Sequence, residues 1–124
     1  MRNLSGPGRR KLLLASPFVL AAGPAGARHA MPAAAVAIEG DSAAISIDNF
    51  TFSPALITIG PGTRVVWTNR DDIPHTILGR DDPLTLRSPP LDTDDVFSFV
   101  FTAPGTYRYF CSLHPHMQGA VVVR

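Results

Sequence analysis

The sequence predicts an all-β fold, a Greek-key β-sandwich of about seven to eight strands. From residue 34 onward, short runs of alternating or β-branched residues are separated by turns rich in Pro, Gly and Asp. No segment shows the apolar spacing of an amphipathic helix of normal length, and the chain has no internal repeat. A length of 124 residues with 45% hydrophobic content suits one small domain with a single core. Short strands punctuated by turns at this spacing are typical of a sandwich.

The first predicted strands lie in the runs AVAIE and AISIDNFTF. In the second run, Ile45 and Ile47 share one face, and we expect Phe50 and Phe52 to share a face as well. Pro54 interrupts this pattern, and the run LITIG resumes it before the turn at residues 60–62. The next run, RVVWTN, is expected to place three side chains on one face: Val65, Trp67 and Asn69.

The second half of the chain continues the pattern after a turn and a short strand in DDIPHTILG. Residues 79–95, rich in Pro and Asp, are predicted to form a mainly irregular connection. The run VFSFVF then places Phe residues on alternate positions, and the APG turn at 103–105 precedes TYRYFC. In that strand Cys111 shares the predicted core face with Tyr107 and Tyr109, and GAVVVR forms the last strand.

The N-terminus has the features of an export signal. The basic residues 9–11 precede a short apolar run, and Ala25–Ala27 provides the small residues at which signal peptidase cleaves. We therefore predict a signal peptide at 1–27, a flexible N-terminal segment with a possible first strand at 28–41, and the folded domain at 42–124. The paired arginines fit a twin-arginine signal as well as an ordinary one, so the export route stays open. The protein is expected in the periplasm, or otherwise exported.

The charge distribution argues against a nucleic-acid partner. Residues 28–124 contain seven arginines and ten acidic residues, a net charge of −3, whereas nucleic-acid binding requires a basic surface. No apolar stretch reaches the roughly 18 residues of a membrane span, so no stable span is expected. We expect a monomer.

The segment CSLHPHM, residues 111–117, concentrates the groups that bind soft metals. Cys111, His114 and Met117 are spaced three residues apart at the end of a predicted strand, where a tight loop can direct all three inward. A thiolate, two imidazoles and a weak axial thioether form the blue-copper ligand set. His75 is the best second imidazole, because His29 lies just beyond the predicted cleavage site and His116 lies between two ligands.

Other uses of these residues fit less well. Structural zinc sites require four Cys or His ligands, and a thioether is a weak partner for zinc. A Cys–His nucleophile is conceivable, but no oxyanion hole or substrate pocket is recognisable, so we predict that the protein is not an enzyme. The expected cofactor is one copper ion that alternates between Cu(I) and Cu(II).

Two segments resemble the cupredoxins, the type 1 blue copper proteins, and specifically their amicyanin and plastocyanin-like branch. These are FTFSPALITIGPGTRVVWTNRDDIPHTI and FSFVFTAPGTYRYFCSLHPHMQGAVVV, and the match extends over roughly residues 45–123. The resemblance implies an eight-stranded sandwich with copper at one end and the ligands His75, Cys111, His114 and Met117. It also implies that Asn69 lies behind the site and ties the His75 loop to the Cys111 loop.

The resemblance implies single-electron transfer between redox proteins such as a dehydrogenase, an oxidase or a cytochrome. The expected electron-transfer surface contains Pro74, Phe110, Pro115 and His116. Amicyanins carry an aromatic residue where this chain has His116, and residues 80–95 match the family weakly. The alternative function is copper delivery, storage or resistance, because the same four ligands serve either role.

Overall fold

The computed structural model describes residues 35–124, and these residues form nine β-strands and no helix. The strands are β1 (Val36–Ala37), β2 (Ser42–Asp48), β3 (Thr51–Ser53), β4 (Leu56–Ile59), β5 (Thr63–Asn69), β6 (Leu78–Gly79), β7 (Val96–Phe101), β8 (Gly105–Phe110) and β9 (Gln118–Val123). The predicted signal peptide and His29 lie outside the described residues. No helix among the described residues is long and apolar enough to cross a membrane.

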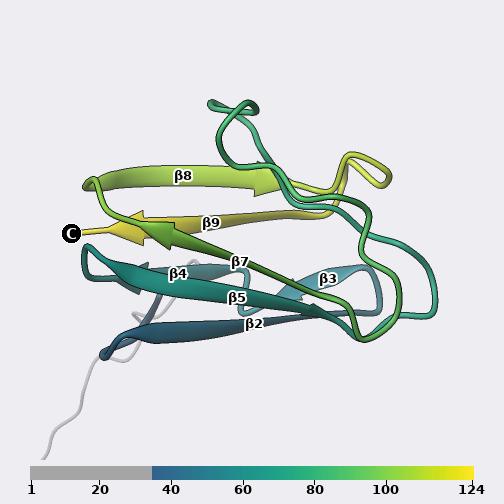
Figure 1. The fold of residues 1–124 in the computed structure, drawn as a ribbon, viewed down its shortest axis with the longest axis horizontal. Helices are drawn as coiled ribbons and strands as arrows, with labels where there is room; N and C mark the ends of the chain where they lie inside the picture. The colour runs from purple at the N-terminus through teal and green to yellow at the C-terminus, as the bar shows by residue number, and fades with distance from the viewer. Residues whose placement is uncertain (1–34) are drawn as a thin grey trace, which may run out of the picture. The chain divides into compact units, whose positions relative to one another are not determined.

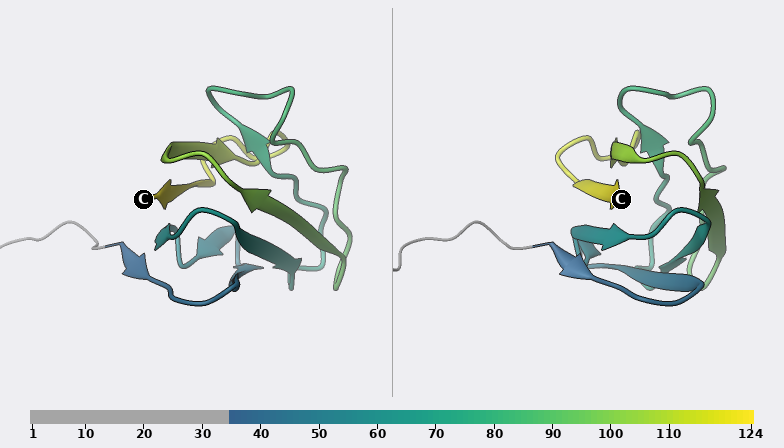
Figure 2. Two further views of the ribbon diagram at one scale, coloured as in Figure 1. Left: turned by 60° about the vertical axis from the view of Figure 1, so that its left-hand side comes forward. Right: turned by 90° about the vertical axis from the view of Figure 1, so that its left-hand side faces the viewer.

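The strands form two sheets that pack face to face (Figures 1 and 2). One sheet has the order β1-β4-β9-β8-β6 and the other has the order β3-β2-β5-β7. Both sheets are mixed. In the four-stranded sheet β2 pairs with β5 in parallel and β5 pairs with β7 antiparallel, and in the five-stranded sheet β9 pairs with β4 in parallel and with β8 antiparallel. The predicted all-β sandwich is therefore confirmed.

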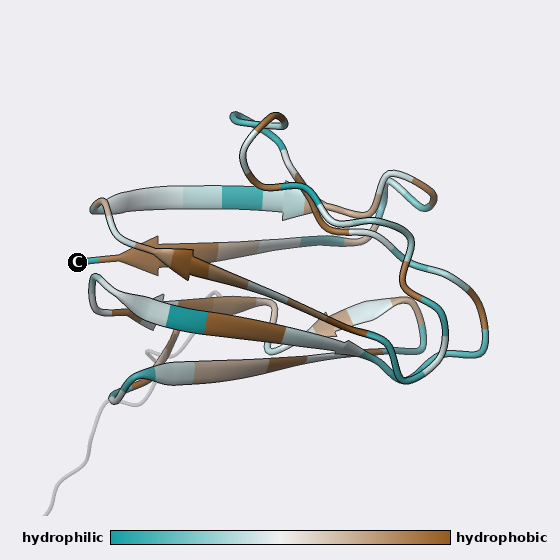
Figure 3. Ribbon diagram, in the orientation of Figure 1, coloured by the Kyte–Doolittle hydropathy of each residue, from teal (hydrophilic) through white to brown (hydrophobic). Residues whose placement is uncertain are grey.

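Alternation along the strands builds the core between the sheets, and Figure 3 shows apolar stretches on strands of both sheets. In β5, Val65, Trp67 and Asn69 are fully buried, whereas Arg64 is exposed. In β8, Tyr109 is fully buried, as is Cys111 directly after the strand. The two strands that precede the candidate ligands are thus fixed by large buried side chains, and a one-residue slip would turn those side chains outward.

The expectation that Phe50 and Phe52 share a face is wrong. Phe52 is buried in the core, but Phe50 is 42% exposed in the turn between β2 and β3. Because Asp48 pairs with Thr51, only Asn49 and Phe50 form the turn, and both have positive φ values of 52° and 56°. A two-residue turn with this backbone breaks the alternation and directs the Phe50 ring away from the core.

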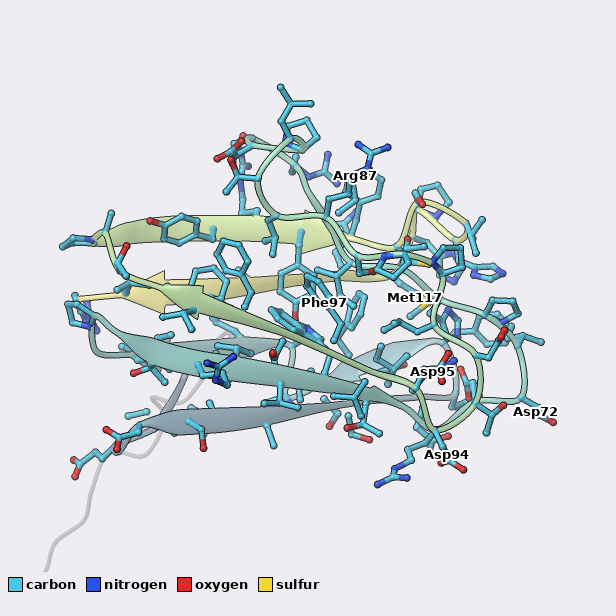
Figure 4. All side chains as sticks on the ribbon, viewed as in Figure 1. Asp72, Arg87, Asp94, Asp95, Phe97 and Met117 are labelled. Atoms are coloured by element: carbon cyan, nitrogen blue, oxygen red, sulfur yellow. The ribbon has the colours of Figure 1, made fainter. Side chains whose placement is uncertain are left out.

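The irregular connection predicted at residues 79–95 forms as expected. It runs along one side of the sandwich and returns to the sheet end where Met117 lies (Figures 1 and 4). Two isolated bridges attach it to the domain, one from Leu78 to Arg87 and one from His75 to Leu91. Leu86 and Leu91 add buried side chains to the core, so this connection supports the His75 loop.

Candidate metal centre

The loop after β5 places His75 at one end of the sandwich. The Asn69 side chain donates to the carbonyl oxygens of Ile73 and Leu91, at 2.9 and 2.8 Å, and accepts from the Asp71 N–H at 2.9 Å. The His75 backbone pairs with Leu91 in both directions. These bonds fix the loop around a fully buried imidazole.

The Asp71 carboxylate determines which nitrogen of His75 is free. Oδ2 of Asp71 lies 2.7 Å from Nε2 of His75, so Nε2–H donates to the carboxylate and Nδ1 keeps its lone pair. Nδ1 points to Sγ of Cys111, 3.7 Å away. Burial alone would raise the pKa of the Asp71 carboxyl, but hydrogen bonds from the Phe50 N–H, the His75 ring and the Asn49 N–H together lower that pKa below its usual value.

The loop from Cys111 to Met117 is closed by its own backbone. The His114 N–H donates to the Cys111 carbonyl at 3.2 Å, and the Met117 N–H donates to the His114 carbonyl at 2.9 Å. The Cys111 N–H donates to the Met117 carbonyl at 3.1 Å, which brings both ends of the loop together. The tight turn expected from the three-residue spacing is therefore present.

The structure brings His75, Cys111 and His114 together. One donor atom from each of the three residues lies within 4.8 Å of the other two, and Nδ1 of His114 is 3.7 Å from Sγ of Cys111. Met117 is 2% exposed, at the same end of the sandwich (Figure 4). A soft thiolate with two imidazoles and a neighbouring thioether fits copper better than any hard cation.

The residues predicted for the electron-transfer surface differ in their surroundings. Pro74, Pro115 and His116 are exposed in the loops that contain the candidate ligands. The ring of His116 lies 6.4 Å from that of His114, centroid to centroid, and does not join the donor cluster. Phe110 is half-buried, and the guanidinium of Arg80 lies 5.2 Å from its ring centroid.

The predicted tie between Asn69 and the Cys111 loop is replaced by two separate links. Asn69 joins the His75 loop to Leu91, as its hydrogen bonds show. Thr76 makes the link to the Cys111 loop: its N–H lies 3.4 Å from Sγ, and its hydroxyl accepts from the Ser112 N–H at 2.8 Å. Hydrogen bonds at the cysteine sulfur are among the features that tune the potential of a blue-copper site.

Two further residues at the site were not predicted from the sequence. Asp71 is the fourth residue before His75, but nothing in the sequence distinguishes its carboxylate from that of the adjacent Asp72. Phe50 packs edge-on against the rings of His75 and His114, with centroid distances of 5.6 and 5.1 Å. Its contact depends on the β2–β3 turn, which lies about 25 positions away in sequence from His75.

An Asn69→Ala variant is expected to bind copper about 10–100-fold more weakly, the usual cost of losing a group that orients metal ligands. The change removes the three side-chain hydrogen bonds by which Asn69 holds the loop before His75. Competition titration with a chromophoric copper chelator measures the affinity, and Gln118→Ala, which removes an exposed amide side chain at the start of β9, is the control. Unchanged affinity in Asn69→Ala would show that the loop does not need this support.

Comparison with known proteins gives a consistent result. The family described as copper binding proteins, plastocyanin/azurin family, matches residues 40–124. An amicyanin-alpha from Methylorubrum extorquens is 35% identical over 85 residues, covering 66% of this chain and 71% of the relative. The amicyanin of Paracoccus versutus is 31% identical over 98 residues and covers 74% of this chain and 72% of its own.

Solved structures agree. A purple cupredoxin from Nitrosopumilus maritimus superposes with a TM-score of 0.62 at 38% identity, over 66% of this chain and 99% of the other. A mutant amicyanin in its Cu(I) form superposes with a TM-score of 0.63 at 28% identity, over 68% of this chain and 84% of the other. The chain belongs to the plastocyanin/azurin family of copper-binding proteins, as a cupredoxin of the amicyanin and plastocyanin branch.

Proposed function

We propose that this chain is an exported, mononuclear type 1 copper protein that carries single electrons between redox proteins. The assigned ligands are His75, Cys111, His114 and Met117. The observation that carries the proposal is the donor cluster, in which three donor atoms already lie within 4.8 Å of one another. Bound copper supplies a one-electron couple between Cu(I) and Cu(II).

The protein frame suits rapid electron exchange because neighbouring residues hold the ligands in place. Cys111 and His75 are fully buried, and each takes part in a hydrogen bond with another residue, His75 with Asp71 and Cys111 with Thr76. A rigid frame limits the movement of ligand atoms when the charge of the site changes. His114 is the assigned electron path to the surface, since its ring is only partly buried among exposed loop residues, including Pro115 and His116.

The proposed place of work for this protein is outside the cytoplasm, between two redox proteins. Its relatives include an amicyanin and a plastocyanin, and the resemblance to that branch of the cupredoxins implies an electron carrier with redox proteins as partners, rather than an enzyme. Export, supported by the basic and apolar N-terminal sequence, would place this chain with such partners outside the cytoplasm. We propose that it works as a monomer with one electron donor and one electron acceptor.

Copper delivery or storage is the second candidate. The observation that favours it is His116, an exposed imidazole whose ring centroid is 6.4 Å from that of His114. An imidazole at this position offers a departing ion an additional ligand. Delivery would require copper to leave readily, whereas the buried Cys111 and His75 favour retention.

Two rates distinguish these functions. Electron self-exchange can be measured by NMR line broadening in mixtures of Cu(I) and Cu(II) protein, and Cu(I) loss by transfer to a chelator. The carrier function predicts fast self-exchange with slow Cu(I) loss. Slow self-exchange combined with rapid Cu(I) transfer would overturn it and favour delivery.

A further inference from the structure

The Asp71 carboxylate joins two separate parts of the site. Oδ2 accepts hydrogen bonds from Nε2 of His75 at 2.7 Å and from the Phe50 N–H at 2.9 Å. Oδ1 accepts from the Asn49 N–H at 2.6 Å. The backbone of Asp71 is itself fixed, since its N–H donates to Asn69 and its carbonyl accepts from Thr93. A single anion therefore binds both a buried candidate ligand and the β2–β3 turn.

The β2–β3 turn is strained, and its strained residue faces the metal centre. A bulky residue such as Phe50 is strained at a φ of 56°, because its Cβ crowds the backbone there. Two adjacent N–H groups bound to one carboxylate offset that strain. The Phe50 ring consequently packs on His75 and His114, and lies 6.3 Å from the ring of His116.

We propose that Asp71 is a positioning residue that sets the reduction potential of the metal centre. Its carboxylate fixes the His75 tautomer, lowers the potential by strengthening His75 as a donor, and holds Phe50 over the imidazoles. This inference rests on the proposed electron-carrier function and names the charged group that tunes it.

The direction of the effect follows from electrostatics. A carboxylate bonded to the outer N–H of a metal-bound imidazole raises the basicity of that ligand. The negative charge stabilises Cu(II) more than Cu(I), because Cu(II) carries the larger positive charge. Bulk salt screens buried pairs much less than exposed ones. The His75 ring is fully buried and Asp71 is 9% exposed, so the effect should persist at high ionic strength.

The variant Asp71→Asn tests whether the charge of Asp71 sets the reduction potential, and Asp72→Asn is the matched control. Both variants remove one negative charge, but Asp72 is exposed and adjacent in sequence. An amide oxygen in the place of Oδ2 can still accept from His75 and Phe50, but the amide nitrogen in the place of Oδ1 cannot accept from the Asn49 N–H. The substitution therefore removes the charge and one hydrogen bond to the turn, and the Phe50→Gly background described below separates these two effects. Voltammetry of copper-loaded protein in 0.1 M and 1 M NaCl measures the potential of the parent and both variants.

In Asp71→Asn we expect the ratio of Cu(II) to Cu(I) affinity to fall at least tenfold. This corresponds to a rise of about 59 mV for a one-electron couple, and it should survive 1 M NaCl. Asp72→Asn should show a smaller rise that salt largely removes. Equal shifts in the two variants would overturn the proposal. Asp71→Glu, which retains the charge, should recover part of the parent potential.

Asp71→Asn is also made in Phe50→Gly protein, so that a disturbed β2–β3 turn can be distinguished from the loss of charge. Glycine adopts positive φ without strain, so Phe50→Gly relieves the turn whether or not Asp71 is present. The potential should therefore rise between Phe50→Gly and the double variant Phe50→Gly/Asp71→Asn. No difference between those two would also overturn the proposal. If the parent itself binds copper but does not exchange electrons, the proposed function fails independently of Asp71.

Discussion

Replacing Cys111 with alanine is expected to abolish the intense visible colour of the Cu(II) protein. That colour requires charge transfer from a thiolate to Cu(II), and Cys111 is the only cysteine in the chain. Its sulfur is fully buried and lies 3.7 Å from Nδ1 of both His75 and His114, so no other side chain can provide an equivalent bond. Absorption spectra of protein titrated with Cu(II) measure the effect.

The control for this variant is a change in the same loop that leaves the donors intact. Leu113 is 50% exposed between Cys111 and His114, and Leu113→Ala should retain the absorption band. If Cys111→Ala protein keeps a band of parental intensity, the assignment of Cys111 as a copper ligand is wrong.

The second large effect is expected from His75→Ala, which removes one imidazole and leaves a buried space beside Cys111. Copper should bind more weakly by more than about 100-fold, because loss of a group that only orients a ligand already costs about 10–100-fold. The Cu(II) spectrum should change as well, since one of three close donors is lost. The substitution also leaves the Asp71 carboxylate without its 2.7 Å partner, which destabilises the loop. Chelator competition measures the copper affinity, and electron paramagnetic resonance of the Cu(II) protein detects the change in its spectrum.

His116→Ala is the matched control, since it removes an imidazole from the same end of the molecule. His116 is exposed and outside the donor cluster, so copper affinity and the spectrum should change little. A larger loss in His116→Ala than in His75→Ala would mean that the wrong histidine has been assigned.

Strand periodicity explains why much of the site could be predicted from sequence. Alternation in β8 placed Cys111 on the core side, and the two-residue gaps around His114 predicted a closed loop, which the backbone hydrogen bonds of residues 111–117 confirm. His75 was selected by elimination among four histidines, and it lies in the cluster. The sandwich followed from short alternating runs alone.

Asp71 and Phe50 could not be predicted because their roles depend on contacts distant in sequence. Positive φ at Phe50 contradicts its intrinsic preference, and a carboxylate about twenty residues later helps to stabilise that turn. Thr76 was missed for a related reason. Its contact with Sγ of Cys111 spans 35 positions and follows from the pairing of β6, which begins two residues after Thr76, with β8, which ends directly before Cys111.

The separate origins of the two buried donors also affect how the domain unfolds. His75 lies in the segment between β5 of the four-stranded sheet and β6 of the five-stranded sheet, and Cys111 follows β8, 36 positions further along the chain. An ion bound to both is a cross-link between these two segments, and an unfolded chain would have to close a loop of that length to retain it. Once the free metal concentration exceeds the dissociation constant, each further tenfold increase adds about 1.4 kcal/mol to the free energy of unfolding. The melting temperature should rise with copper loading, and extraction of the ion should lower the temperature at which the domain unfolds.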